Sequence, residues 1–287
     1  MNHKHFLVQP DEKVKLKKYD TKFTGDIKDR AEAEIKLQKD TARLAKYQDI
    51  LYAQNTYALL VVFQAMDAAG KDGTIRHVMS GVNPQGCQVF SFKGPSAEDL
   101  DHDYLWRCQR CLPERGRIGI FNRSYYEEVL VVRVHPEYLE GQQLPPAAKK
   151  KDVWEKRFAE INNFEQYATR NGIEIVKFYL NVSKDEQKRR FLERIERPEK
   201  NWKFSVNDAK ERGFWDEYMA AYEDMLTKTS TKHAPWHIIP ADNKWFARAA
   251  VSDIIVTKLK SLKLRYPRVT EAHKQDLLKA KALLEAS

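Results

Sequence analysis

The hydrophobic and polar positions along the chain form an alternating pattern, in which short apolar runs are separated by segments of helical spacing. The apolar runs are residues 57–63, 87–92, 117–121, 173–180 and 236–240. Short, continuous apolar runs are typical of strands that are buried on both faces of a parallel sheet. Because helical segments separate these runs, the pattern predicts an α/β fold with about five parallel strands covered by helices.

The segments between the strands divide the chain into parts. Residues 1–26 are polar and irregular and predict an extension on the surface. Residues 27–54 predict an amphipathic helix packed against the core, whose apolar positions are Ile27, Ala31, Ile35, Leu37, Leu44, Tyr47 and Leu51. We predict further helices over 71–80, 96–111, 147–170, 183–197 and 243–264, one just after Asn122, one carrying Trp215 to Leu226, and one from Thr270 outside the core. The predicted organisation is therefore 1–54 as extension and packed helix, 55–265 as the core, and 266–287 as a C-terminal helix.

Residues 59–73 are the stretch around which the chain is organised. An apolar strand runs into Gln64-Ala65-Met66-Asp67-Ala68-Ala69-Gly70-Lys71-Asp72-Gly73, and a helix follows. A phosphate-binding loop has this context, because its backbone N–H groups and the helix N-terminus surround an anion while a lysine reaches the terminal phosphate. We therefore assign Ala69, Gly70, Asp72 and Gly73 to phosphate binding and Lys71 to catalysis.

This loop departs from the usual G-x-x-x-x-G-K-[ST] pattern at two positions. Ala65 stands where the first glycine is expected, and Asp72 replaces the hydroxyl residue that normally contacts Mg²⁺. Asp67 lies inside the loop, where its carboxylate is repelled by phosphates unless a divalent cation lies between them. Asp67 therefore either faces away or helps to hold Mg²⁺, and a strand-to-helix turn with an incidental Gly-Lys pair is the alternative.

Composition excludes several classes of protein. Hydrophobic residues make up 42% and charged residues 32% of the 287 residues, and no apolar run approaches the ~20 residues that a membrane span needs. The N-terminus lacks the apolar segment of a secretory signal, and only three cysteines are present. We expect a cytoplasmic protein without a disulfide framework and without a membrane partner.

Positive charge is concentrated in one segment of the chain. The formal net charge is +9, and residues 188–212 carry nine basic and five acidic side chains. A polyanionic partner is one interpretation of this segment, and a solvated helix face is the other. We interpret residues 188–213 as a lid whose cations close over phosphates and exclude water. Trp202 and Phe204 within it either contact a nucleobase or anchor the lid.

The ends of the predicted strands carry further polar groups. Ligands bind beyond the carboxyl ends of the strands in open parallel sheets, which places Asn122 and Arg123 beside Asp67 and Lys71. Arg123 either pairs with phosphate in a bidentate manner or bridges to Glu127 or Glu128. Asn122 is a neutral and therefore weak metal ligand, so we expect metal binding to depend on Asp67 and on substrate phosphates.

Two other patterns carry little functional signal. Cys108-Gln109-Arg110-Cys111 is a C-x-x-C without the second pair that a zinc site requires. His233 and His237 are separated by Pro235, which makes a shared helix face improbable. We expect neither a redox motif nor a histidine–metal site.

Taken together, these motifs make the chain resemble the second polyphosphate kinase family, and within it the group that acts on both AMP and ADP. The motifs that carry the resemblance are residues 64–73, Asn83-Pro84-Gln85-Gly86, Phe121-Asn122-Arg123-Ser124-Tyr125-Tyr126-Glu127, Asn201-Trp202-Lys203-Phe204-Ser205 and Ala234-Pro235-Trp236. The resemblance covers nearly the whole chain and implies a P-loop kinase-like, three-layer fold with a helical lid. Relatives have Asp where this chain has Asn122, which places a protein-held second metal in doubt.

The resemblance also implies an activity and a set of site residues. It implies reversible, Mg²⁺-dependent phosphoryl transfer from inorganic polyphosphate to AMP and ADP, and assembly into a dimer or tetramer. Asp67, Lys71 and Arg123 are the expected catalytic residues, Glu127 is expected near the nucleotide's phosphates, and Asp67 with weaker Asn122 is the expected metal site. The expected polyphosphate-binding residues are Lys93, Arg190, Arg194, Lys203 and Arg212.

Three other functions are compatible with parts of the pattern. An ATP-dependent nucleoside monophosphate kinase would share the architecture, although the lid has more cations than a triphosphate requires. A basic nucleic-acid-binding module would have an inert loop, but the chain lacks an aromatic-basic recognition motif, so nucleic acid is not an expected partner. A degenerate scaffold would not depend on Lys71 for turnover.

Overall fold

A five-stranded parallel sheet forms the centre of the molecule. The structure, a computed structural model, describes residues 1–286 apart from the side chain of Lys203. The strands are β1 (Ala58–Gln64), β2 (Cys87–Ser91), β3 (Ile118–Asn122), β4 (Ile173–Asn181) and β5 (Trp236–Pro240). They lie in the order β2-β3-β1-β4-β5, and each neighbouring pair is parallel. The predicted α/β fold is confirmed.

Strand β1 occupies the middle of the sheet and is buried along its whole length. It pairs with β3 on one side, where Phe63 lies opposite Asn122, and with β4 on the other, where Gln64 lies opposite Tyr179. Its apolar side chains face helices on both sides of the sheet, which is why the run carries no polar alternation. The loop that follows β1 is therefore held at the centre of the carboxyl edge.

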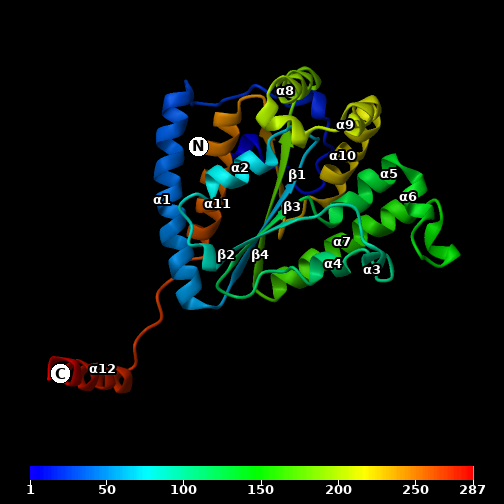
Figure 1. Cartoon of the computed structure of the whole chain (residues 1–287). Coiled ribbons are helices and arrows are strands. Elements are labelled where there is room, and N and C mark those ends of the chain that lie inside the picture. The colour runs from blue at the N-terminus through cyan, green and yellow to red at the C-terminus, as the bar shows by residue number, and fades with distance from the viewer. Residues whose placement is uncertain (287) are drawn as a thin grey trace.

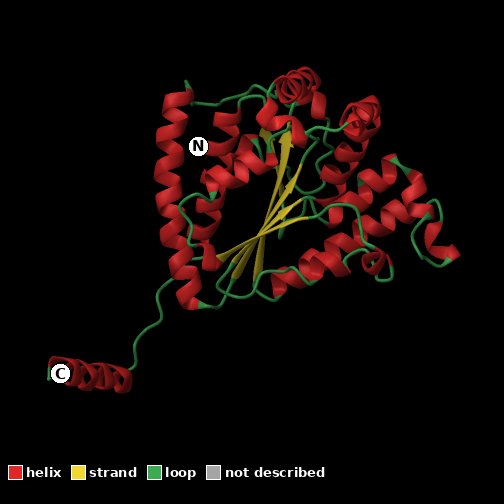
Figure 2. Cartoon of the chain, viewed as in Figure 1, coloured by secondary structure: helices red, strands yellow, loops and turns green. Residues whose placement is uncertain are grey.

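Helices cover both faces of this sheet (Figure 1). On one side lie α1 (Arg30–Gln54), α2 (Lys71–Val78) and α11 (Lys244–Ser261), and on the other lie α7 (Val153–Arg170) and α10 (Trp215–Thr229). Near the carboxyl edge, α8 (Lys184–Glu196) and α9 (Val206–Glu211) lie beyond the strand tips. Figure 2 shows the strands enclosed between these helices, which is the predicted three-layer arrangement.

Several predicted helices are shorter than the sequence suggests. Residues 96–111 form two short helices, α3 (Ala97–Leu100) and α4 (Trp106–Gln109). Ser96 and Asp99 form the capping box that begins α3, but the Asp103 carboxylate accepts a hydrogen bond from the backbone N–H of Leu105, which stabilises a loop instead of a continuous helix. The remaining short elements are α5 (Val131–Val134), α6 (Pro136–Glu140), and the 3-10 turns η1 (His3–His5), η2 (Leu16–Lys18), η3 (Pro84–Gly86), η4 (Tyr125–Val129), η5 (Pro146–Lys149), η6 (Pro198–Lys203) and η7 (Arg212–Phe214).

The N-terminal segment is more than the surface extension that its polar composition predicts. Phe6, Val8 and Val14 are fully buried. Leu7 forms an antiparallel bridge with His237, so this segment pairs with the outer edge of β5. The backbone N–H of Val8 donates to the Trp236 carbonyl at 2.9 Å, which covers an edge that would otherwise be open to other chains.

Helix α1 packs with only part of its predicted face: Leu44 and Leu51 are on it as expected, and Ile35 is not. Ile35 is 54% exposed, whereas Leu44 and Leu51 are fully buried. Asp40 is buried on the inner side as well, where its carboxylate lies 3.0 Å from Nζ of Lys36. A partly buried ion pair therefore lies on the inner side of this helix, and apolar spacing alone does not reveal it.

The C-terminal helix α12 (Glu271–Glu285) lies outside the core, as predicted, and extends away from the body of the molecule (Figure 1). None of its residues is buried, and Leu277, Leu278, Leu283 and Leu284 are all more than half exposed. The hydroxyl of Thr270 caps its first turn by accepting from the backbone N–H of His273. In the described residues, no helix is both long and apolar enough to cross a membrane.

A buried ion pair joins the elements behind the sheet's carboxyl edge. Nζ of Lys177 on β4 lies 2.6 Å from the carboxylate of Glu165 on α7, and both side chains are fully buried. That carboxylate also accepts from the hydroxyls of Tyr125 at 2.8 Å and Tyr126 at 2.7 Å. Burial lowers the pKa of Lys177 to about 8, against the opposing effect of Glu165. The pair therefore anchors the turn that follows β3.

Removing Glu165 should destabilise the protein strongly. The Glu165→Ala substitution leaves a buried lysine without its counter-charge and two tyrosine hydroxyls without an acceptor. We expect the free energy of unfolding to fall by about 3–5 kcal/mol, measured by urea denaturation. Glu160→Ala, on the exposed face of the same helix, should cost less than ~1 kcal/mol. Equal losses for the two variants would contradict this account of the buried pair.

Candidate functional site

The loop after β1 has the backbone geometry of an anion-binding turn. Ala68 (φ +61°) and Gly70 (φ +110°) both adopt left-handed conformations, which fold the chain back before α2 begins at Lys71. The helix has no side-chain N-cap among the described residues. The N–H groups of its first turn therefore remain available, and the helix dipole adds partial positive charge at the same point.

An ion pair joins this loop to the end of β3. The guanidinium of Arg123 lies 2.7 Å from the carboxylate of Asp67. Arg123 thus bridges to Asp67 and not to Glu127 or Glu128, the carboxylates considered from sequence. Lys71 is buried, and its Nζ donates to the Ala65 carbonyl at 2.8 Å. The structure brings the three predicted catalytic residues together at one edge of the sheet.

These charges alter one another's ionisation. Burial opposes ionisation of Asp67, but Lys71 and Arg123 outweigh it and hold the pKa of its carboxyl below the ordinary value. Burial and the proximity of Arg123 lower the pKa of Lys71 to about 8, although Asp67 opposes the change. Burial disfavours the charged form of Arg123, yet Glu127 and Asp67 more than compensate and raise its pKa. Asp67 and Arg123 are therefore both charged at neutral pH.

The backbone at the end of β3 fixes these side chains. Arg123 has φ +65°, an uncommon conformation for a residue with a Cβ. Its backbone N–H donates to the Phe63 carbonyl at 3.0 Å. The amide of Asn122 donates to the Asp72 carboxylate at 2.7 Å and so links β3 to the first turn of α2. Strain at functional residues is tolerated where surrounding contacts over-determine the conformation.

Gln64 is a positioning residue that the sequence analysis missed. Its side-chain amide donates to the carboxylate of Glu127 at 2.8 Å, and its carbonyl oxygen lies 3.4 Å from the hydroxyl of Ser124. Gln64 is completely buried. A polar residue at the end of an otherwise apolar strand is the signal that indicates such a role, because a buried amide needs specific partners.

A pocket of about 210 Å³ opens beside Asp67 and Arg123. Residues from the loop, from the turn after β3, from α5 and α6, from α8 and the lid segment, and from α10 line it. They are Ala65, Met66, Asp67, Arg123, Glu127, Val131, His135, Tyr138, Gln187, Asn207, Asp208, Glu211, Arg212, Tyr218 and Tyr222. We call this pocket the central cleft; its aromatic rings and mixed charges suit a ligand that is part ring and part phosphate.

The lid segment contributes directly to the central cleft. Arg212 lines it, while its guanidinium donates to the Lys184 carbonyl at 2.6 Å and to the Gln187 side chain at 3.0 Å. Arg194 acts on the Asp67 carboxyl by its charge. Phe204 packs edge-on against Phe191 of α8 at 5.4 Å between ring centroids, which is the anchoring arrangement. Lys203, expected to bind polyphosphate, has a side chain outside the described residues.

The structure corrects the expectation that Arg190 binds polyphosphate. Its side chain is 97% buried, with a relative exposure of 3%. The guanidinium donates to the carbonyls of Ala68, Ala69, Ala241 and Asp242 at 2.6–3.0 Å, and its Nε donates to Glu186 at 2.7 Å. All five N–H groups are used within the protein, so Arg190 supports the phosphate-binding loop from behind and has no donor left for polyphosphate.

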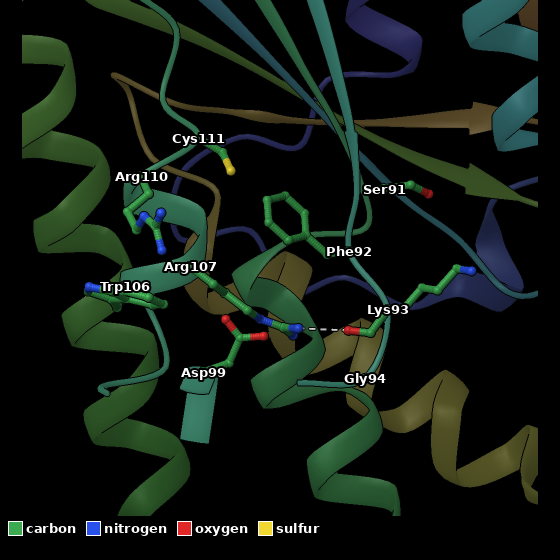
Figure 3. Close-up of a pocket in the computed structure, with 9 residues that line it drawn as sticks. All are labelled: Ser91, Phe92, Lys93, Gly94, Asp99, Trp106, Arg107, Arg110 and Cys111. Carbon is green, nitrogen blue, oxygen red and sulfur yellow. Dashed lines mark hydrogen bonds between the residues drawn. The ribbon is translucent and has the colours of Figure 1, made fainter. Parts of the chain in front are cut away.

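Lys93 lies outside the central cleft. It belongs to a second pocket of about 370 Å³ beyond the end of β2, shown in Figure 3. Arg107 donates to the Lys93 carbonyl at 2.7 Å, and Arg110 stacks on Trp106 with 4.5 Å from guanidinium carbon to ring centroid. In Figure 3 the Lys93 side chain extends away from these residues. Lys93 therefore does not share a pocket with Asp67 and Arg123, and its position does not support the expected contact with polyphosphate.

The cysteines lie apart from the central cleft. Cys108 is fully buried, Cys111 lines the second pocket, and Cys87 lies on β2. Burial raises the pKa of each thiol, so the neutral form predominates at neutral pH.

The oxygen donors near the loop fit a Mg²⁺ ion that is held mainly by substrate. Within residues 1–286, no group of three or more His, Cys, Asp or Glu residues is placed to hold a metal ion. Asp67 supplies one ionised carboxylate at the loop, and Asn122 supplies an amide that is already bonded to Asp72. Mg²⁺ commonly uses one or two carboxylates and completes its octahedral shell with phosphate oxygens and water. Asp67 is therefore the residue best suited to this ion.

Comparisons with known proteins agree with this geometry. The family model described as polyphosphate kinase 2 matches residues 27–267. An ADP-polyphosphate phosphotransferase of Rhodopseudomonas palustris is 53% identical over 98% of both chains, and an AMP/ADP-polyphosphate phosphotransferase of Meiothermus ruber is 44% identical over 92% of this chain and 96% of its own. The crystal structure of polyphosphate kinase 2 from Arthrobacter aurescens TC1 superposes with a TM-score of 0.84 at 40% identity and covers 93% of each chain. This chain belongs to the polyphosphate kinase 2 family.

Proposed function

We propose that this protein moves the terminal phosphoryl group of inorganic polyphosphate to AMP and to ADP, giving ADP and ATP, in a reversible reaction that requires Mg²⁺. Family membership supports the reaction class, and the names of both relatives contain polyphosphate and an adenine nucleotide. The observation that carries the proposal is the convergence of Asp67, Lys71 and Arg123 at one edge of the sheet.

The chemistry needs no general base from the protein. The attacking atom is a phosphate oxygen of AMP or ADP, which is already ionised at neutral pH. Catalysis of phosphoryl transfer then depends on alignment of the two phosphates and on neutralisation of their charge. Lys71 and Arg123 provide fixed positive charge at the loop, and the N–H groups of the first turn of α2 provide further donors.

We assign the acceptor nucleotide to the central cleft. Its walls include the rings of Tyr138, Tyr218 and Tyr222, which suit a nucleobase. Glu127 is held by Gln64 at the same cleft, near the expected position of the nucleotide's phosphates. Arg194 and Arg212 of the lid segment are the proposed contacts to polyphosphate near the reacting group, joined by Lys203.

Asp67 is the proposed ligand for Mg²⁺, and Asn122 contributes at most a weak contact. A Mg²⁺ ion held there would supply positive charge that neutralises the transferring phosphoryl group. Within the protein, the Arg123 guanidinium compensates the negative charge of the Asp67 carboxylate. We also propose a homo-oligomer, a dimer or tetramer, in the cytoplasm; the three cysteines, all free thiols, suit a reducing compartment.

A donor assay tests the proposed function directly. The purified protein is incubated with AMP or ADP, Mg²⁺ and either polyphosphate or ATP, and nucleotide products are separated by chromatography. We expect ADP and ATP to form with polyphosphate as the only donor. Full activity with ATP and AMP but none with polyphosphate would instead identify a nucleoside monophosphate kinase, and strong nucleic-acid binding without turnover would identify a binding module.

Loss of Lys71 should abolish most of the activity. Lys71→Ala removes a charge aimed at the reacting phosphates, and one such preorganised donor contributes about 100-fold or more to kcat. We expect a fall of at least ~100-fold in the steady-state assay. Lys156→Ala, which removes an exposed lysine on α7, is the matched control and should leave kcat unchanged. Unchanged turnover in Lys71→Ala would support a degenerate scaffold.

The pKa of Lys71 predicts a pH dependence. Burial lowers this pKa to about 8 in the free protein, and only the protonated amine stabilises phosphate charge. Because kcat/KM reports ionisation of the free enzyme, we expect it to fall as the pH rises through about 8. Bound phosphates raise the lysine pKa, so kcat should persist to higher pH. A kcat/KM profile that is flat from pH 7 to 10 would contradict the role of Lys71.

A further inference from the structure

Three cations gather beside the phosphate-binding loop, and none has a hydrogen-bond or ion-pair partner among the described residues. They are Arg76 on α2, and Lys244 and Arg248 on α11. Neither a hydrogen bond nor an ion pair joins any of them to residues 1–286, and the buried Nε of Arg248 is unsatisfied. Arg76 and Lys244 are exposed. We call these three residues the α2–α11 cation cluster.

The cluster lies against the first turns of the helix that begins at the phosphate-binding loop. Nη2 of Arg248 is 3.7 Å from the position that a Cβ on Gly73 would occupy, so the guanidinium covers the first turn of α2. Arg76 follows Gly73 by three residues and therefore lies on the same face of α2. Lys244 precedes Arg248 by one helical turn on α11. Helices α2 and α11 lie side by side in Figure 1.

Arg76 and Arg248 repel each other, and Lys244 is repelled by other cations near the loop. Burial lowers the pKa of Arg248, and Arg76 and Arg30 lower it further. Burial likewise lowers the pKa of Lys244, and Arg190 adds to the effect, although Glu193 partly opposes it. The nearby carboxylates are already engaged: Glu34 binds Arg30, Glu186 binds Arg189 and Arg190, and Glu193 binds Lys200.

This arrangement is costly for the protein alone and favourable for a polyanion. Like charges held close together destabilise a folded chain, whereas a linear polyanion that crosses them releases its counterions and neutralises them. Other cations around the loop are satisfied internally: Arg190 binds backbone carbonyls, and Arg123 binds Asp67. The α2–α11 cation cluster is instead available to a ligand from outside.

The cluster lies across β1 from the central cleft. The cleft is lined from the turn after β3, α5, the lid segment and α10, whereas α2 and α11 cover the opposite face of the sheet (Figure 1). The N-terminus of α2 lies between the two. A chain whose terminal phosphate is held at the loop can therefore continue over the first turn of α2 without competing for the nucleotide's space.

We propose that Arg76, Lys244 and Arg248 bind the phosphate units of polyphosphate that follow the reacting unit, and thereby favour long chains as donors. This inference rests on the proposed function, because it assigns the donor's path beyond that site. The cluster adds affinity only for chains long enough to reach it. It makes no contact with the transferred phosphoryl group.

Chain-length kinetics test the proposal. The variant Arg76→Ala/Lys244→Ala/Arg248→Ala is assayed with ADP and with either long-chain polyphosphate or tetrapolyphosphate as donor. We expect KM for the long chain to rise at least about fivefold, while KM for tetrapolyphosphate changes less than twofold. The dependence of the long-chain KM on salt should also become shallower, because fewer counterions are released.

A matched variant controls for net charge. Lys274→Ala/Lys279→Ala/Lys281→Ala removes the same number of positive charges from α12, which lies far from the loop (Figure 1), and should leave both KM values unchanged. Equal KM changes for both donors in the cluster variant, or none for the long chain, would overturn the proposal. The single variant Lys244→Ala alters an exposed side chain and gives the same test if the triple variant folds poorly. Absence of polyphosphate-dependent activity in the unaltered protein would instead refute the proposed function.

Discussion

The pairing of β1 with β3 determines the geometry of the site. In this parallel register Phe63 lies opposite Asn122, and the backbone N–H of Arg123 bonds to the Phe63 carbonyl. The loops that follow β1 and β3 therefore begin side by side at the carboxyl edge of the sheet. This brings Asp67 and Arg123 together as an ion pair at 2.7 Å. A shift of one residue would turn the side chains of either strand to the opposite face. The apolar side chains of β1, which fix its register with β3, thus also fix the distance between Asp67 and Arg123.

Much of the fold follows from local sequence patterns. Each of the five strands was expected within about one residue of its observed ends, because fully buried strands leave continuous apolar runs. The junctions after β1 and β3 were also expected to meet, since ligand groups collect at the carboxyl edge of a parallel sheet. Ser183 begins α8 as predicted, where its hydroxyl accepts from the backbone N–H of Glu186.

The deviations from the predictions share a physical cause. Tertiary contacts bury residues that the composition of their segments places on the surface. The N-terminal segment has few apolar residues, yet Phe6 and Val8 are buried because the edge of β5 offers backbone partners. Arg190 belongs to a basic segment that suggests surface charge, but the carbonyls behind the loop satisfy it completely. Charge patterns along a sequence show how many cations a segment carries, and only the three-dimensional structure shows which of them are already bound.

The amide of Asn122 affects how the two halves of the site are joined. If this residue were an aspartate, two carboxylates would face each other across the contact with Asp72, and a shared proton or a metal ion would be needed to hold them together. The asparagine amide instead donates a hydrogen bond of 2.7 Å to that carboxylate. The protein's own residues therefore hold the junction between the loop and β3 together. Because this contact lies within the protein, ordering of the junction adds little to the cost of binding substrate.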